Sequence, residues 1–278
     1  MTAARMSPVH QREETTVTLL QSLVTSTRAY GTLLGGGGGT VGRHSRLVQL
    51  VGDRGKATAL ILRVARRCQD EAQNESAVEL YLAAGQPLRG LVILTRKLAD
   101  VILANKATGT IVELAEFKEL EHKGQEAVAA IHELAMEPLG DRNGEDKSST
   151  TARIQVEQFE ALRVVAQLLE SASRQQWSTG LMQLNKLDRF FPRGTGGGQE
   201  VGRCYEALVE CKQVRAHAED VLEAAGQVLR HHVFEQRGSG NHAEVQRRMD
   251  HLMQLAAKLK LSRASGALLA ICSEMELK

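Results

Sequence analysis

The sequence is poor in aromatic side chains, which make up only 3% of its 278 residues. Leu, Val and Ala must therefore form most of the core, and they pack well between helices, whereas strands favour aromatic and β-branched residues. No segment alternates cleanly enough between apolar and polar residues to predict a strand. The chain also lacks an excess of either charge, because 35 Lys and Arg stand against 33 Asp and Glu. Nucleic acid is therefore not expected as a direct ligand.

The four cysteines show no CxxC spacing. Cys204 and Cys211 are two helical turns apart, about 10 Å along a helix axis, which is too far for a disulfide. We expect Cys68, Cys204, Cys211 and Cys272 to be small buried apolar residues in a reducing compartment. The nine histidines include no HExxH pair, and adjacent His231 and His232 point to different helix faces. The sequence therefore predicts no metal site.

A glycine-rich stretch, residues 37–44, has the glycine spacing of a phosphate-binding loop. Such a loop needs a lysine and then a Ser or Thr after its second glycine, but Arg43 and His44 occupy these positions. We therefore expect a linker that binds no nucleotide. Ser45, Ser76 and Ser178 lack the context of a nucleophile elbow. The sequence predicts no catalytic, cofactor-binding or metal-binding residue and assigns no residue to a protein interface.

Two short helices joined by a tight turn are the sharpest pattern in the chain. Ala77, Leu80, Tyr81 and Ala84 follow one face of a helix, and Gly85 is suited to the turn that ends it. Pro87 is suited to the first position of the next helix. The second helix repeats the apolar spacing at Leu88, Leu91, Val92, Thr95, Leu98 and Ile102. Neither helix can bury its apolar stripe alone, so the pair must stack on neighbouring helices, as in an α-solenoid.

The rest of the chain also follows the helical period. Helices are expected at about 13–30, 56–73, 110–136, 152–172, 173–191 and 200–236, with a penultimate helix that begins at Asn241 and a last helix at 264–275. A capping box at Thr110 and Glu113 is expected to open the third of these helices. The predicted fold is all-α, an elongated α-helical solenoid of stacked antiparallel helices. Residues 1–47 are expected to form an amino-terminal helix and a Gly-rich linker. Residues 48–278 form the solenoid domain, with flexible loops near 138–150 and 193–199.

No segment predicts a signal peptide, because charged residues precede the first apolar run and threonines interrupt it. The stretch from Thr15 to Gly42 carries a single charge at Arg28, but its threonines and glycines argue against a membrane span.

The paired helices resemble the nucleoporin-interacting-component family, the large inner-ring scaffold nucleoporins of the nuclear pore complex. Leu80, Ala83-Ala84-Gly85 and Pro87 match a helix that ends in Leu-x-x-Ala-Gly. The segment from Leu94 to Ile102 matches the Asn-Arg-x-Leu-Ser-Glu-Val-Leu pattern that follows, with Thr95 in place of Asn and Ala99 in place of Ser. The order of helices downstream also fits, so the resemblance is expected to cover residues 48–278 and the carboxy-terminal part of the family's solenoid.

The resemblance implies a structural scaffold subunit of the inner ring that supports protein and mRNA transport through the nuclear envelope. Its partners would be other inner-ring nucleoporins, with no small-molecule substrate and no enzymatic activity. The alternative is a generic helical-repeat adaptor, either tetratricopeptide-like or vesicle-coat-like. A tetratricopeptide array would show a period of about 34 residues, and this chain shows no regular period.

Overall fold

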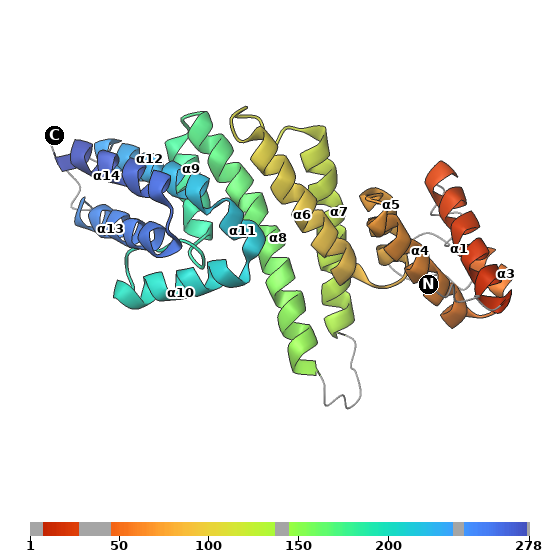
Figure 1. The fold of residues 1–278 in the computed structure, drawn as a ribbon. Coiled ribbons are helices and arrows are strands. Elements are labelled where there is room, and N and C mark those ends of the chain that lie inside the picture. The colour runs from red at the N-terminus through yellow and green to blue at the C-terminus, as the bar shows by residue number, and fades with distance from the viewer. Residues whose placement is uncertain (1–7, 28–45, 137–144, 236–241, 277–278) are drawn as a thin grey trace, which may run out of the picture. The chain divides into compact units, whose positions relative to one another are not determined.

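The computed structural model describes residues 8–27, 46–136, 145–235 and 242–276, and these residues form thirteen helices and no strand (Figure 1). The all-α prediction and the stacked helices of a solenoid are confirmed. The helices are α1 (Pro8–Thr27), α3 (Arg46–Val51), α4 (Arg54–Asp70), α5 (Asn74–Ala83), α6 (Pro87–Asn105), α7 (Ala115–Met136), α8 (Glu145–Ser173), α9 (Trp177–Lys186), α10 (Gly197–Glu210), α11 (Lys212–Ala216), α12 (Ala218–Glu235), α13 (His242–Leu259) and α14 (Ser262–Glu276).

The chain divides into two compact units. The N-terminal unit consists of residues 1–94 and 124–143, and the C-terminal unit of residues 95–123 and 144–278. Helices α6 and α7 therefore each contribute residues to both units. The predicted division into residues 1–47 and 48–278 is a different partition and stays a prediction, as does the predicted elongation. The glycine run Gly35–Gly39 and most of the predicted 138–150 loop lie outside the described residues.

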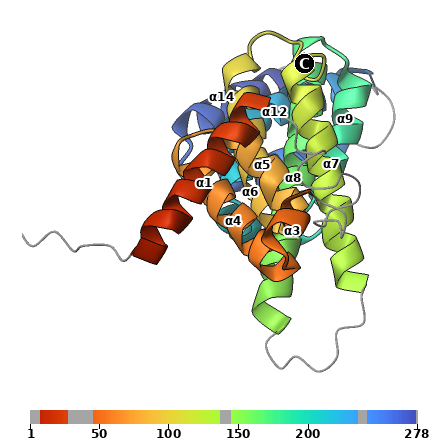
Figure 2. The same ribbon diagram turned by 90° about the vertical axis from the view of Figure 1, so that its right-hand side faces the viewer.

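The N-terminal unit is built around α4, which packs against α1, α3 and α5 (Figure 2). Asp53 begins α4 by accepting a hydrogen bond from the backbone N–H of Lys56 at 2.7 Å, which satisfies one donor of the first turn. The apolar side of α4 includes Ile61, Val64 and Cys68, all at most 2% exposed. Tyr81 of α5 is buried beside it and donates its hydroxyl to Gln69 at 2.9 Å.

The predicted turn between α5 and α6 is confirmed. Gly85 has φ +69°, a conformation that a residue with a Cβ adopts with difficulty, and Pro87 is the first residue of α6. Within the predicted stripe of α6, Leu91, Thr95, Leu98 and Ile102 are buried. The prediction is wrong for Val92, because it is 37% exposed and Leu94 takes its place in the core.

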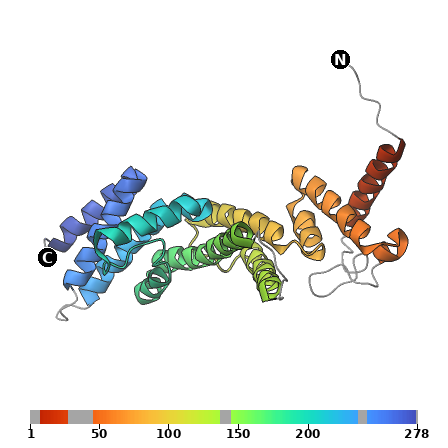
Figure 3. The same ribbon diagram turned by 90° about the horizontal axis from the view of Figure 1, so that it is seen from below.

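The C-terminal unit is organised around α12, which contacts α8, α9, α13 and α14 (Figure 1). Its buried residues include Val221, Leu222, Ala225 and Val228. The last two helices, α13 and α14, lie side by side (Figure 3). Sequence neighbours pack on each other, as α8 does with α9 and α13 with α14. Helix α12 packs on its neighbours and also on α8, α9 and α14, which come from other parts of the chain.

The prediction of a single helix from Glu200 to Gln236 is wrong, because the structure divides this segment into α10, α11 and α12. The backbone leaves the helical conformation at Cys211 (φ −98°, ψ 74°), and α11 ends at His217 (φ −99°, ψ 0°). The backbone N–H of Gln213 instead donates to the side chain of Gln158 on α8 at 3.3 Å. The three pieces pack on different sets of helices: α10 on α13, α11 on α8, and α12 on α8, α9, α13 and α14. Tertiary packing thus overrides a continuous local pattern.

Two predicted helix starts also differ from the structure. The capping box at Thr110 does not form, since α7 begins five residues later and the backbone N–H of Val112 donates to the carboxylate of Glu170 at 2.6 Å. Helix α8 begins at Glu145, earlier than the expected Ala152.

Candidate protein-interaction surface

A buried carboxylate fixes the turn that joins α9 to α10. Glu200, in the first turn of α10, accepts hydrogen bonds from the backbone N–H groups of Arg193 (2.8 Å), Gly194 (3.2 Å) and Gly196 (3.1 Å). Burial acts to raise the pKa of Glu200, but these backbone donors and His251 outweigh it, so the pKa lies below its ordinary value. The predicted 193–199 loop is thus hydrogen-bonded over its first part, and α10 begins within it at Gly197. Its flexibility stays a prediction.

Arg248 of α13 holds the same turn from the other side. Its guanidinium donates to the backbone carbonyl of Pro192 at 3.2 Å and to the side chain of Asn185 at 2.7 Å. The side chain is 7% exposed, and burial lowers its pKa to about 10, so it still carries its charge at neutral pH. Glu200 and Arg248 therefore fix the positions of α9, α10 and α13 within the C-terminal unit.

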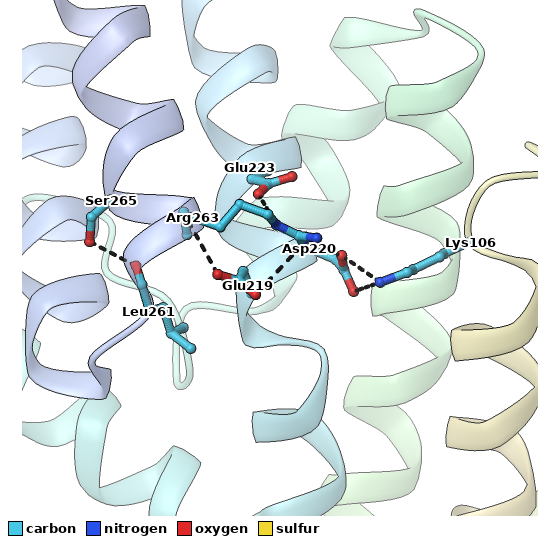
Figure 4. Close-up of polar contacts among 8 residues, drawn as sticks. Lys106, Glu219, Asp220, Glu223, Leu261, Arg263 and Ser265 are labelled. Atoms are coloured by element: carbon cyan, nitrogen blue, oxygen red, sulfur yellow. Dashed lines mark hydrogen bonds and ion pairs between the residues drawn. The ribbon is translucent and has the colours of Figure 1, made fainter.

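An ion-pair network connects three further segments of this unit (Figure 4). Asp220, in the first turn of α12, lies between two cations: Lys106 Nζ at 2.9 and 2.8 Å, and Arg263 Nη2 at 2.8 Å. Arg263, in the first turn of α14, also donates to Glu223 at 2.6 Å. Because the Arg263 side chain is 55% exposed, solvent screens its pairs, and the network positions α14 on α12 more than it stabilises the fold.

His217 lies between the end of α11 and the start of α12, and it is only 1% exposed. Burial lowers its pKa below the ordinary value of 6.5, and Lys106 acts in the same direction, while the carboxylates of Asp220 and Asp100 oppose it. The folded protein therefore favours the neutral imidazole.

We expect acid to destabilise the C-terminal unit through His217. As pH falls below 6.5, the unfolded chain binds a proton at this imidazole before the folded chain does, so the free energy of unfolding decreases. Urea denaturation between about pH 7.5 and 5 measures this slope. His217→Gln, which cannot titrate, is expected to show a shallower slope over the same range, and an unchanged slope would contradict the assignment.

A hollow of about 520 Å³ opens where α9, α12 and α14 meet, and we call it the Trp177 hollow. One face of α12 lines this hollow with Gln227, Arg230 and His231. Trp177 is the first residue of α9, Gln175 lies in the turn before it, and Ala267 and Ile271 belong to α14. The lining is thus partly apolar and partly polar, which suits a ligand that has both kinds of surface.

Trp177, the single tryptophan of the chain, stacks on His231. The ring centroids are 4.0 Å apart and the planes are inclined by 3°, so the two rings lie face to face and each covers one face of the other. Arg230 donates to the carboxylate of Glu274 at 2.6 Å, which fixes the position of its guanidinium. Among the described residues of the lining, Arg230 is the one with a permanent charge, and Glu274 pairs with it. The apolar pattern of the sequence placed Trp177 on the face of a helix, but it did not predict the contact between Trp177 and His231.

The other residues considered from the sequence form no centre for chemistry within the part of the chain that the structure describes. All four cysteines are buried, as predicted, and none of them forms a disulfide. Burial raises the pKa of Cys204 to about 12 and that of Cys211 to about 11, so neither is a reactive thiolate at neutral pH. Within the described ranges, no group of three or more His, Cys, Asp or Glu side chains is placed to hold a metal ion. The same residues include no helix that is both long and apolar enough to cross a membrane.

Comparison with protein families shows that residues 1–264 match the Nup93/Nic96 family. The match begins at residue 1 and ends at residue 264, so it includes the segment 1–47, which lies outside the expected range of 48–278. Comparison with curated proteins gave no match.

Proposed function

Because the chain belongs to the Nup93/Nic96 family of nuclear pore scaffold nucleoporins, we propose that it is a structural subunit of the inner ring of the nuclear pore complex. In this role it supports nucleocytoplasmic transport of protein and mRNA through contacts with other inner-ring nucleoporins. The observation that carries the proposal is the family match, which extends over residues 1–264.

The geometry agrees with a protein that acts through its surfaces. The cysteines are buried, and the buried polar groups Glu200 and Arg248 connect helices within the C-terminal unit. The described residues that line the Trp177 hollow are partly apolar and partly polar. The proposed role is that of a structural protein, with no catalysis, no small-molecule substrate and no direct contact with nucleic acid.

Localisation of the tagged full-length gene product in its own cell tests the proposal. We expect a punctate nuclear rim, because contacts with other nucleoporins would hold the protein at the pore. A uniformly cytoplasmic or vesicular signal would contradict the proposal and favour a helical-repeat adaptor.

A further inference from the structure

We propose that Thr195 is a phosphorylation site of a protein kinase that recognises basic residues, and that Arg203 binds the phosphate once it is attached. Thr195 lies in the turn that joins α9 to α10, within the C-terminal unit. The proposal depends on this turn alone and is independent of the proposed function.

The hydroxyl of Thr195 is accessible. Its side chain is exposed, and within the described ranges it has no hydrogen-bond partner. The backbone on either side is held in place, because the carboxylate of Glu200 accepts hydrogen bonds from the N–H groups of Gly194 at 3.2 Å and Gly196 at 3.1 Å. The fold thus presents this hydroxyl at its surface, and modification of the hydroxyl breaks no side-chain contact.

Arg193 lies two residues before Thr195, where a basic side chain can pair with carboxylates of a kinase. Its guanidinium donates to the backbone carbonyl of Asn185 at 2.8 Å and pairs with Asp188 at 2.9 Å. The side chains of Arg193 and Asp188 are 48% and 50% exposed. Solvent screens such a pair, so a kinase can replace Asp188 at little cost in free energy.

The same spacing occurs once more among the described residues, at Arg263 and Ser265, but there the fold opposes modification. Ser265 is half-buried in the first turn of α14 and donates its hydroxyl to the backbone carbonyl of Leu261 at 2.9 Å. Arg263 is held by Asp220 and Glu223. The structure therefore distinguishes two segments that have equivalent spacing in the sequence.

Arg203 of α10 is placed to bind the phosphate. A Cβ at Gly196 would lie 3.3 Å from Arg203 Nη2, so the guanidinium lies beside the residue that follows Thr195. Arg203 is exposed and has no hydrogen-bond or ion-pair partner among the residues that the structure describes. A phosphate carries about −1.5 to −2 charges and three acceptor oxygens, which suit a planar guanidinium. Glu200 repels this phosphate, but backbone N–H groups already stabilise its carboxylate, whereas Arg203 has no other partner.

The modification uses ATP as its second substrate. Thr195 Oγ1 attacks the γ-phosphorus of ATP, and an O–P bond forms. The bond from this phosphorus to the oxygen that bridges the β-phosphate breaks, and ADP leaves. The proton of the hydroxyl passes to the catalytic aspartate of the kinase.

Incubation of the purified full chain with ATP and the catalytic subunit of cyclic-AMP-dependent protein kinase tests the site. We expect tandem mass spectrometry to find phosphate on Thr195 and none on Ser265. Arg193→Ala is expected to lower the initial rate at Thr195 about tenfold or more, and Arg203→Ala to change it less than about twofold. An unmodified Thr195, or equal effects of the two substitutions, would overturn the proposal.

Phosphorus-31 NMR of the phosphorylated chain tests the role of Arg203. The signal of the modified Thr195 is assigned by its absence from Thr195→Val. Because a guanidinium favours the dianion, the second pKa of this phosphate is expected to lie about 0.5 below its value in the denatured chain. Arg203→Ala is expected to abolish this difference, whereas Arg215→Ala, at an exposed position of α11, is expected to leave it unchanged. A pKa that does not respond to Arg203→Ala would overturn the assignment of the phosphate's partner.

Both experiments use the purified chain, so their outcomes are independent of the nuclear rim that tests the proposed function. A rim without modification of Thr195 contradicts the phosphorylation site alone. Modification of Thr195 without a rim contradicts the proposed function alone.

Discussion

Leu91→Asp is expected to lower the free energy of unfolding by about 4 kcal/mol or more, and to reduce the melting temperature accordingly. Leu91 is fully buried on α6. The substitution removes a leucine side chain from a packed core and places a carboxylate in its position, where no hydration is available. Thermal denaturation followed by far-ultraviolet circular dichroism measures the effect.

The neighbouring Val92 supplies the control. It lies on the same helix but is 37% exposed, so Val92→Asp keeps its carboxylate in contact with water. We expect a loss of less than about 1 kcal/mol for this variant. If the two variants melted at the same temperature, the buried face assigned to α6 would be wrong.

Gly194→Ala is expected to be the most damaging of the possible alanine substitutions in the turn before α10, with a loss of about 3 kcal/mol. Gly194 has φ +87°, and a Cβ at this position would lie 2.8 Å from the backbone nitrogen of Arg248 and 2.9 Å from its Cα. The substitution therefore combines a strained backbone conformation with a clash against backbone atoms, which cannot rotate away. Urea denaturation measures the loss.

Two glycines of the same stretch separate these causes. Gly197 has φ +62°, and a Cβ at this position would have no atom within 4 Å, so Gly197→Ala is expected to lose only the strain of the backbone, about 1 kcal/mol. Gly198 has equally open surroundings and no positive φ, so Gly198→Ala is expected to be neutral or slightly stabilising. A loss for Gly194→Ala no greater than that for Gly197→Ala would show that Arg248 does not approach the turn this closely.

The sequence predicted the local parts of the fold that depend on short-range chemistry. Gly85 and Pro87 mark a turn and a helix start because their backbone preferences are intrinsic, and both are where the pattern placed them. The buried face of α5 follows directly from the helical period. The cysteines were identified as buried because they lack the paired spacing of metal or redox sites.

The parts that the sequence did not predict depend on contacts between distant residues. The apolar stripe from Cys204 through Cys211 to Val221 continues without interruption, and no glycine or proline marks the breaks at Cys211 and His217. At these breaks the set of packing partners changes, from α13 for α10 and α8 for α11 to four helices for α12. The capping box at Thr110 fails for a similar reason, since Glu170 on α8 binds the backbone N–H of Val112.

The candidate site could be found in the sequence only in part. Gln227, Arg230 and His231 occupy i, i+3 and i+4 positions of one helix, and this polar face is visible in the sequence. Its position beside Trp177 and Ile271 depends on the packing of α9 and α14 on α12, which no local pattern specifies.

Cross-linking mass spectrometry on isolated nuclear envelopes tests the central claim most directly. Lys186, Lys212 and Lys260 are exposed in the C-terminal unit and accessible to amine-reactive reagents. The account predicts that these lysines form cross-links to other nucleoporins of the inner ring. Cross-links confined to proteins of the cytoplasm or of vesicle coats, with none to a nucleoporin, would contradict it.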